Sequence, residues 1–176
     1  MRIKNHSLLR SFISEYPNHG FDNTLLKTVC IQFSLELNGI HGVYHWHRVY
    51  KNALKLAKHY EIDSKVFMLF ALFHDSRREN DNIDPLHGKR GGRYAKSIQN
   101  NISVLKALSK EELELLEYVC SSHTKTDYEH AFSDNLIANI CWDADRLDIG
   151  RVGFIVDPDY LHTDYAKELA SPLLKG

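Results

Sequence analysis

The sequence has no long apolar run and no cysteine pair at metal-binding spacing. Its longest apolar stretch, residues 66–73, is too short to span a bilayer, and no uninterrupted apolar run follows Met1, so we expect neither a membrane span nor a secretory signal. The cysteines stand far apart in apolar, helix-like patterns, which is typical of reduced core residues in a cytoplasmic protein. They are Cys30, Cys120 and Cys141.

The chain also lacks an excess of charge of either sign. Its 22 Lys and Arg and 23 Asp and Glu give a formal net charge of −1. As a whole it therefore has no electrostatic signature of a DNA-, RNA- or membrane-binding protein, and any affinity for phosphate must be local. With 176 residues, 43% of them hydrophobic, the chain is long enough to bury one core, and we expect a single domain over residues 1–176.

Strand-like alternation is absent as well, whereas helical periodicity is frequent. The pattern predicts an all-α fold of about six to eight helices, antiparallel and joined by loops. The helix that carries residues 66–73 is apolar on all sides, so we expect it to be the central buried helix, with Ser64 as its cap. Ser109 and Glu112 form a capping box that opens another helix. The predicted helices cover residues 23–38, 44–60, 64–73, 87–100, 109–123, 133–149 and 163–169.

Eleven histidines are the one compositional outlier, and several lie at the ends of predicted helices. His74 and Asp75 follow directly on the apolar run of the central helix. A buried imidazole beside a carboxylate costs free energy unless both groups find partners, and a shared metal ion would supply them. Each of the other polar interruptions lies where a helix could present it to the same cavity. They are His45, His87, His123 and Asp145.

This order of residues resembles a known family. The pattern is similar to the H…HD…D signature of the HD-domain metal-dependent phosphohydrolases, and two further histidines match the H…HD…H…H…D version, which holds two metals. The resemblance covers about residues 40–152, and it implies a bundle of helices around a buried metal site. The segments that carry it are His45-x-x-Arg48-Val49, His74-Asp75, His87-Gly88, Ser121-Ser122-His123-Thr124 and Asp145-Arg146-Leu147.

The resemblance also implies a ligand set for two divalent metals. One metal would be bound by His45, His74, Asp75 and Asp145. The second would be bound by Asp75 together with His87 and His123. Asp75 would then be the bridging ligand that orients a metal-bound water, the nucleophile of the implied mechanism. The donor types do not distinguish Mn, Mg, Fe, Co, Ni and Zn.

Cationic residues cluster near the proposed ligands. Arg77 and Arg78 follow Asp75, and Lys89 and Arg90 follow His87, so these four are candidates to bind the phosphate of a substrate. Three other residues lie close to the proposed ligands in the sequence, and we expect them to contact and orient those ligands. For the two histidines among them, a place at the surface is the open alternative. The three residues are His41, His47 and Arg146.

The sequence therefore predicts a cytoplasmic metal-dependent phosphohydrolase that acts on a nucleotide or another small phosphate ester. Two alternatives stay open at this point. Some relatives with the same six-ligand pattern hold two irons and use dioxygen to cleave carbon–carbon or carbon–phosphorus bonds. A third possibility is a non-catalytic domain that senses a nucleotide. The substrate, the native metal and the oligomeric state do not follow from the sequence.

Overall fold

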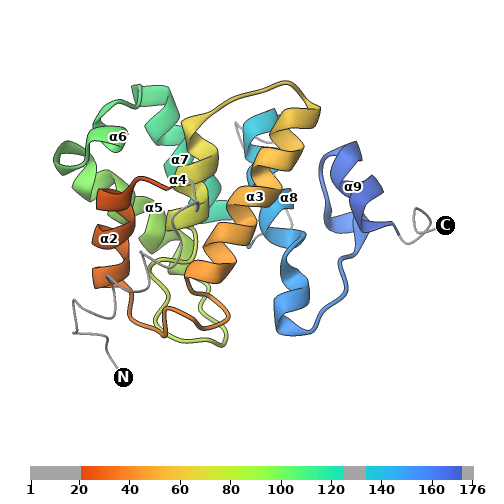
Figure 1. Ribbon diagram of the computed structural model, residues 1–176, viewed down its shortest axis with the longest axis horizontal. Coiled ribbons are helices and arrows are strands. Elements are labelled where there is room, and N and C mark those ends of the chain that lie inside the picture. The colour runs from red at the N-terminus through yellow and green to blue at the C-terminus, as the bar shows by residue number, and fades with distance from the viewer. Residues whose placement is uncertain (1–20, 125–133, 172–176) are drawn as a thin grey trace.

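The computed structural model describes residues 21–124 and 134–171. Within these ranges the chain forms eight α-helices, three short 3₁₀ helices and no β-strand, so the predicted all-α fold is confirmed (Figure 1). None of these helices combines the length and the apolar character that crossing a membrane would require. The α-helices are α2 (Asn23–Gln32), α3 (Val43–His59), α4 (Lys65–Phe73), α5 (His87–Ile98), α6 (Ser103–Lys106), α7 (Lys110–Ser122), α8 (Leu136–Arg146) and α9 (Asp164–Ala170); the 3₁₀ helices are η1 (Gln99–Asn101), η2 (Ile149–Val152) and η3 (Pro158–Tyr160).

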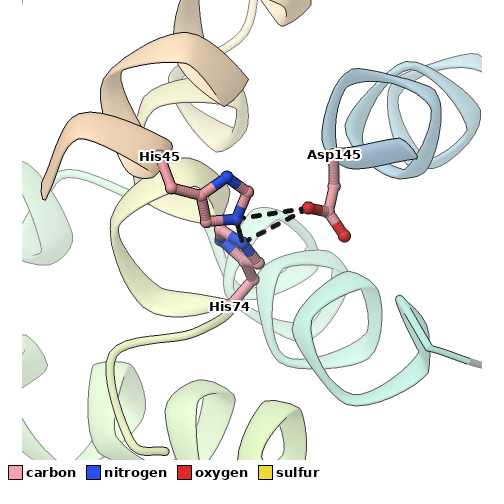
Figure 2. A group of neighbouring side chains, drawn as sticks. All are labelled: His45, His74 and Asp145. Atoms are coloured by element: carbon pink, nitrogen blue, oxygen red, sulfur yellow. Dashed lines mark hydrogen bonds and ion pairs between the residues drawn. The ribbon is translucent and has the colours of Figure 1, made fainter. Parts of the chain in front are cut away.

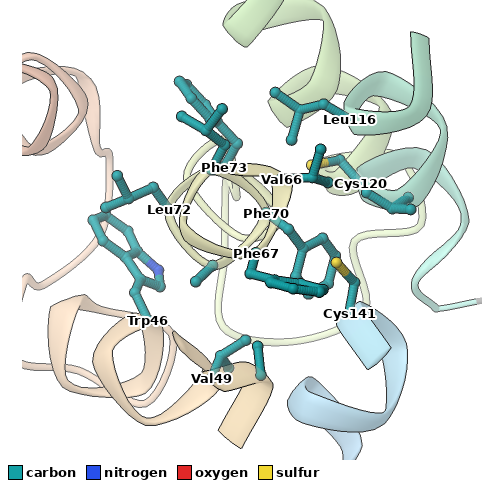
Figure 3. Packing of buried hydrophobic residues seen from close by; sticks show 14 of the residues in the cluster. Trp46, Val49, Val66, Phe67, Phe70, Leu72, Phe73, Leu116, Cys120 and Cys141 are labelled. Atoms are coloured by element: carbon teal, nitrogen blue, oxygen red, sulfur yellow. The ribbon is translucent and has the colours of Figure 1, made fainter. Parts of the chain in front are cut away.

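Helix α4 is the centre of the hydrophobic core. Ser64 caps it by accepting a hydrogen bond from the amide of Val66 at 3.1 Å. Phe67, Phe70 and Phe73 have no solvent exposure, and Figure 3 shows side chains from the neighbouring helices packed around the α4 axis. Burying a side chain of this size contributes roughly 1.5–3 kcal/mol. The apolar surface of α4 therefore anchors the bundle, and the end of α4 is a fixed point in it.

Several predicted helix bounds differ from the structure. The predicted helix over residues 23–38 was too long, because α2 ends at Gln32 and Phe33 has extended backbone angles. Leu37 is nevertheless buried, and its carbonyl accepts a hydrogen bond from the amide of Val43 at 2.8 Å. The predicted helix over residues 133–149 begins at Leu136 and ends at Arg146, while residue 133 lies outside the described residues. Helix α6 was not predicted.

Close backbone contacts bring α5 against α4 and α7. A Cβ atom on Gly91 would lie 2.1 Å from the Phe73 carbonyl oxygen, and one on Gly88 would lie 2.1 Å from the Cys120 carbonyl oxygen. Only glycine leaves room for such an approach. The glycines in the first turns of α5 therefore position the start of that helix, with His87, beside the ends of α4 and α7.

We expect the substitution Gly91→Ala to destabilise the fold. Alanine favours a helix over glycine by about 1 kcal/mol, but the added methyl group would collide with the main chain at the end of α4, which cannot yield as a flexible side chain would. A net loss of about 1–3 kcal/mol in the free energy of unfolding is expected. Urea denaturation of the variant measures it.

The matched control is Gly150→Ala, because nothing lies within 4 Å of a Cβ atom built on Gly150. This control should change the free energy of unfolding by less than about 1 kcal/mol. Equal denaturation midpoints for the two variants would show that the α4–α5 contact can relax.

Candidate metal centre

The six side chains expected to bind metal converge at the ends of five helices. His45 lies in the first turn of α3, His74 is the C-cap of α4 and is followed by Asp75, and His87 is the first residue of α5. His123 is the C-cap of α7, and Asp145 lies in the last turn of α8. The four histidines and Asp75 are buried, and the Asp145 side chain is 15% exposed. The structure therefore brings all six together.

His45, His74 and Asp145 form the first group of potential metal ligands (Figure 2). The Nε2 atoms of His45 and His74 lie 2.9 Å apart. The Oδ1 atom of Asp145 lies 3.3 Å from the first of these nitrogens and 3.7 Å from the second. Three donor atoms from three different helices thus surround one small volume.

Asp75, His87 and His123 form the second group. The Nε2 atoms of its two histidines lie 2.9 Å apart, and Asp75 Oδ1 is 3.0 Å from that of His87. The other carboxylate oxygen, Asp75 Oδ2, lies 3.5 Å from His45 Nε2 in the first group. The two oxygens of one carboxylate therefore face different pairs of histidines.

The other ring nitrogen, Nδ1, is hydrogen-bonded in all four histidines. That of His74 lies 3.1 Å from the carbonyl oxygens of both Phe70 and Ala71. That of His123 lies 2.7 Å from the Cys120 carbonyl oxygen. A carbonyl oxygen can only accept, so Nδ1 must carry the proton. His87 Nδ1 donates in the same way to the Asp84 carbonyl, and His45 Nδ1 donates to the Asp148 carboxylate at 2.7 Å.

This pattern leaves unshared electron pairs pointing at one another. A neutral imidazole with its proton on Nδ1 has a lone pair on Nε2. In each group the Nε2 atoms of two imidazoles face each other at 2.9 Å, so two lone pairs meet wherever both rings are neutral. Among the described residues, the buried Oδ1 atom of Asp145 also has no hydrogen-bond donor. A cation is the partner that all these atoms lack. The donor set of imidazole nitrogens and carboxylate oxygens suits a divalent transition metal, so each group could hold one.

Burial keeps two of the four histidines in the neutral form that binds a metal. Burial lowers the pKa of His74 to about 3 and that of His123 to about 4, in spite of the carboxylates nearby. Both rings are therefore neutral at neutral pH, with Nε2 free of a proton. Burial would also lower the pKa of His45, but its hydrogen bonds with the carboxylates of Asp145 and Asp148 outweigh that effect and raise the pKa. Burial alone would raise the pKa of Asp75, but the surrounding imidazoles outweigh it and hold the pKa well below its ordinary value. The carboxylate is therefore ionised.

Asp148 and His41 contact the candidate ligands. The sequence left His41 open between a supporting role and a place at the surface, and it gave Asp148 no role. Asp148 accepts the Nδ1 proton of His45 and is itself held by Arg48, whose Nε lies 2.6 Å from its Oδ1. His41 Nδ1 lies 2.8 Å from Asp75 Oδ2. The available signal for Asp148 was its place three residues after Asp145, which puts both on one face of the helix predicted over residues 133–149.

The residues flanking the site have diverse roles. His47 makes an edge-to-face contact with Phe21, at a centroid distance of 6.4 Å, and Arg146 Nη1 lies 2.8 Å from His162 Nε2. Neither contact is with a proposed ligand. Asp143, which also flanks Asp145, accepts hydrogen bonds from the amides of His162 and Thr163, both at 2.8 Å. Asp143 thus fixes the segment that leads into α9.

The four cationic residues expected to bind phosphate lie in different surroundings. Arg78 is the one beside the ligands, with its Nε 3.4 Å from Asp75 Oδ1 and only 11% of its side chain exposed. Arg77 donates to the Gln32 carbonyl and covers the Tyr94 ring. Arg90 donates to Asp84 and to the Arg77 carbonyl, and Lys89 is exposed. Arg77 and Arg90 thus hold the loop between α4 and α5.

We expect Asp148→Ala to weaken metal binding at the first group by about 10–100-fold, because a carboxylate behind a histidine ligand fixes the ring and its tautomer. Asp148→Asn should cost less, since its amide oxygen can still accept the Nδ1 proton of His45. Titration calorimetry with Mn²⁺ measures both affinities.

Asp63→Ala is the control for that comparison, because Asp63 is exposed and lies before α4, outside both groups. It should bind Mn²⁺ as the wild type does. Unchanged affinity in Asp148→Ala would mean that His45 is oriented without its carboxylate partner.

Comparison with known proteins supports the fold. The crystal structure of a predicted HD superfamily hydrolase from an uncultured Thermotogales bacterium is similar to this chain with a TM-score of 0.63; the match covers 84% of this chain and 81% of that one, at 24% sequence identity. No protein-family model and no curated protein matches the sequence. The chain therefore has the fold of this predicted HD superfamily hydrolase, and each of its two His/Asp groups could hold a metal ion.

Proposed function

We propose that this protein is a metal-dependent phosphohydrolase that acts on a nucleotide or another small phosphate ester. The observation that carries the proposal is the position of Asp75, whose two carboxylate oxygens face two separate pairs of histidine Nε2 atoms. The fold shared with a predicted HD superfamily hydrolase supports a hydrolytic reaction. The expected cytoplasmic location is consistent with three buried free thiols.

The residues present would hold two divalent cations. One would be bound by His45, His74, Asp75 and Asp145, and the other by Asp75, His87 and His123, with Asp75 shared between them. Such a pair of cations lowers the pKa of a coordinated water and takes up charge that develops on phosphoryl oxygens.

The chain's own groups would prepare this site for the reaction. His41 restrains the Oδ2 atom of Asp75 through the 2.8 Å contact, so the shared carboxylate keeps one orientation. The buried imidazoles exclude bulk water from the carboxylates, which strengthens every charge interaction among them.

Arg78 is the best placed of the four cationic residues to bind phosphate. Its Nε and Nη1 atoms are buried and have no hydrogen-bond acceptor among the described residues. The ion pair with Asp75 Oδ1, at 3.4 Å from Nε, leaves these two donors without a hydrogen bond, and a phosphate offers oxygens with the matching geometry. Arg78 would therefore bind a phosphoryl oxygen beside the shared carboxylate, Asp75.

The metal content of the purified protein tests the proposal first. We expect about two equivalents of a divalent metal per chain in the wild type and about one in His87→Ala, because that substitution removes a ligand of the second group alone. Inductively coupled plasma mass spectrometry of protein purified without chelator measures this, alongside release of phosphate from p-nitrophenyl phosphate.

His59→Ala is the matched control, because His59 is an exposed histidine that stacks on Tyr165 away from both groups. It should keep about two equivalents. Iron that responds to reductant and consumes dioxygen would instead favour the oxygenase. Failure to take up any added metal would overturn both proposed enzymatic functions, the phosphohydrolase and the oxygenase. The non-catalytic nucleotide-sensing domain would then be the remaining alternative.

Substitution of Arg78 tests the phosphate contact. Removing one preorganised donor to a transition-state oxygen typically costs about 10²–10³-fold in rate, so Arg78→Gln should lower kcat/KM for p-nitrophenyl phosphate by about that factor. Lys89→Gln should change it by less than about threefold, because Lys89 is exposed and its contribution is screened. Equal effects of the two substitutions, at wild-type metal content, would exclude the contact with Arg78.

A further inference from the structure

A cavity of about 420 Å³ opens directly beside the two groups of metal-binding residues. Its wall includes one ligand from each group, His123 and Asp145. Most of the remaining wall comes from the segment over residues 149–160, which contains η2 and η3. The volume lies in the lower part of the range of about 300–1,000 Å³ that is usual for pockets binding one small organic molecule.

The outer wall of this cavity is aromatic and apolar, and it is exposed. Phe154 is 66% exposed and Tyr160 57% exposed, and Ile155 beside them is 94% exposed. Gly153, with a φ of 85°, adopts the left-handed conformation directly before Phe154 and so sets the direction in which the segment continues. Single exposed apolar residues need no explanation, but three of them lining one cavity beside a metal centre indicate a binding surface.

Arg151 places a positive charge at the inner end of the same cavity. Arg151 donates from Nε to the Ile40 carbonyl at 3.0 Å and from Nη1 to the Asp148 carbonyl at 3.2 Å, so its guanidinium group is fixed in place. Its Nη2 atom lies 3.9 Å from Asp75 Oδ2, and Nη1 lies 3.8 Å from Asp145 Oδ1. The wall holds a second acidic residue besides Asp145, namely Asp157, which accepts the amide proton of Asp159 within its own turn.

This polarity matches a molecule with an anionic head and an apolar body. A phosphate at the inner end would lie beside Arg151 and the metal-binding residues. The rest of the molecule would then extend between the side chains of the outer wall. Flat rings pack well against aromatic side chains in stacked or edge-to-face geometry, and every nucleobase offers such a face.

We propose that Phe154 and Tyr160 bind a planar ring in the alcohol portion of the substrate, which makes the substrate class a phosphate ester of a ring-bearing alcohol such as a nucleoside. This inference rests on the phosphohydrolase function proposed above and narrows it. Because stacking is tolerant of ring type, the site should accept more than one nucleobase.

The contribution of the ring to catalysis can be measured by comparing two substrates. Adenosine 5′-monophosphate and ribose 5-phosphate carry the same phosphate on the same primary alcohol and differ in the base, so their leaving groups are matched. We expect wild-type kcat/KM to favour the nucleotide by at least about tenfold, the ratio that corresponds to about 1.4 kcal/mol of stacking. Phe154→Ala should bring that ratio close to one, and Phe154→Leu should lower it by less, since leucine keeps apolar contact but has no ring.

Ile31→Ala provides the matched control. Ile31 is also a large exposed apolar residue, at 49%, but it lies on α2, none of whose residues line the cavity. The ratio in this variant should equal that of the wild type. A wild-type ratio near one, or a ratio that Phe154→Ala leaves unchanged, would overturn the inference while leaving hydrolysis intact.

Binding of adenosine alone separates this inference from the proposed function. Adenosine carries no phosphate, so its binding does not depend on hydrolysis, and calorimetry should show at least about tenfold weaker binding to Phe154→Ala than to the wild type. If neither ester is hydrolysed but this difference is found, the proposed function fails and the ring site stands. Equal binding of adenosine to both proteins overturns the ring site.

Discussion

The close approach of four buried imidazoles through their Nε2 atoms is the constraint on which the rest of the site depends. In each group two Nε2 atoms lie 2.9 Å apart, and in every ring the proton is held on Nδ1 by an oxygen acceptor. Such an arrangement is unfavourable until a cation lies among the nitrogens and the nearby carboxylates. The ionised state of Asp75 follows from the same surroundings, because the imidazoles outweigh the effect of burial on its pKa.

Helix ends set this arrangement up. The last turn of an α-helix leaves carbonyl oxygens without partners inside the helix. His74 and His123 are both C-cap residues, and their Nδ1 atoms donate to carbonyls of the last turns of α4 and α7. One hydrogen bond thus satisfies an orphan carbonyl and fixes the tautomer of a ligand. His87 lies at the start of α5, and its acceptor is the carbonyl of Asp84, three residues earlier.

The parts of the site that were predictable from the sequence are those that local patterns determine. The apolar run of α4 with its Ser64 cap and the capping box at Ser109 indicated where two helices lie, and the six proposed ligands follow at or near helix ends. The bounds of α2 were not predictable, because Leu37 is buried by tertiary packing outside any helix. The directions of the Arg77 and Arg78 side chains were not predictable from the sequence either. Adjacent side chains point to different sides of the chain, and only the fold determines which of them faces the site.

Chemistry and recognition are located in different kinds of structure in this fold. The metal-binding residues are buried at the ends of helices that pack around α4, whose phenylalanine side chains contribute roughly 1.5–3 kcal/mol each to the stability that holds polar groups in the interior. The segment over residues 149–160 is instead exposed and made of short 3₁₀ turns. Exposed connecting segments tolerate substitution far better than a packed core. On the function and the ring site proposed above, changes at Phe154 or Tyr160 would alter which phosphate ester binds, while the buried centre would remain the same.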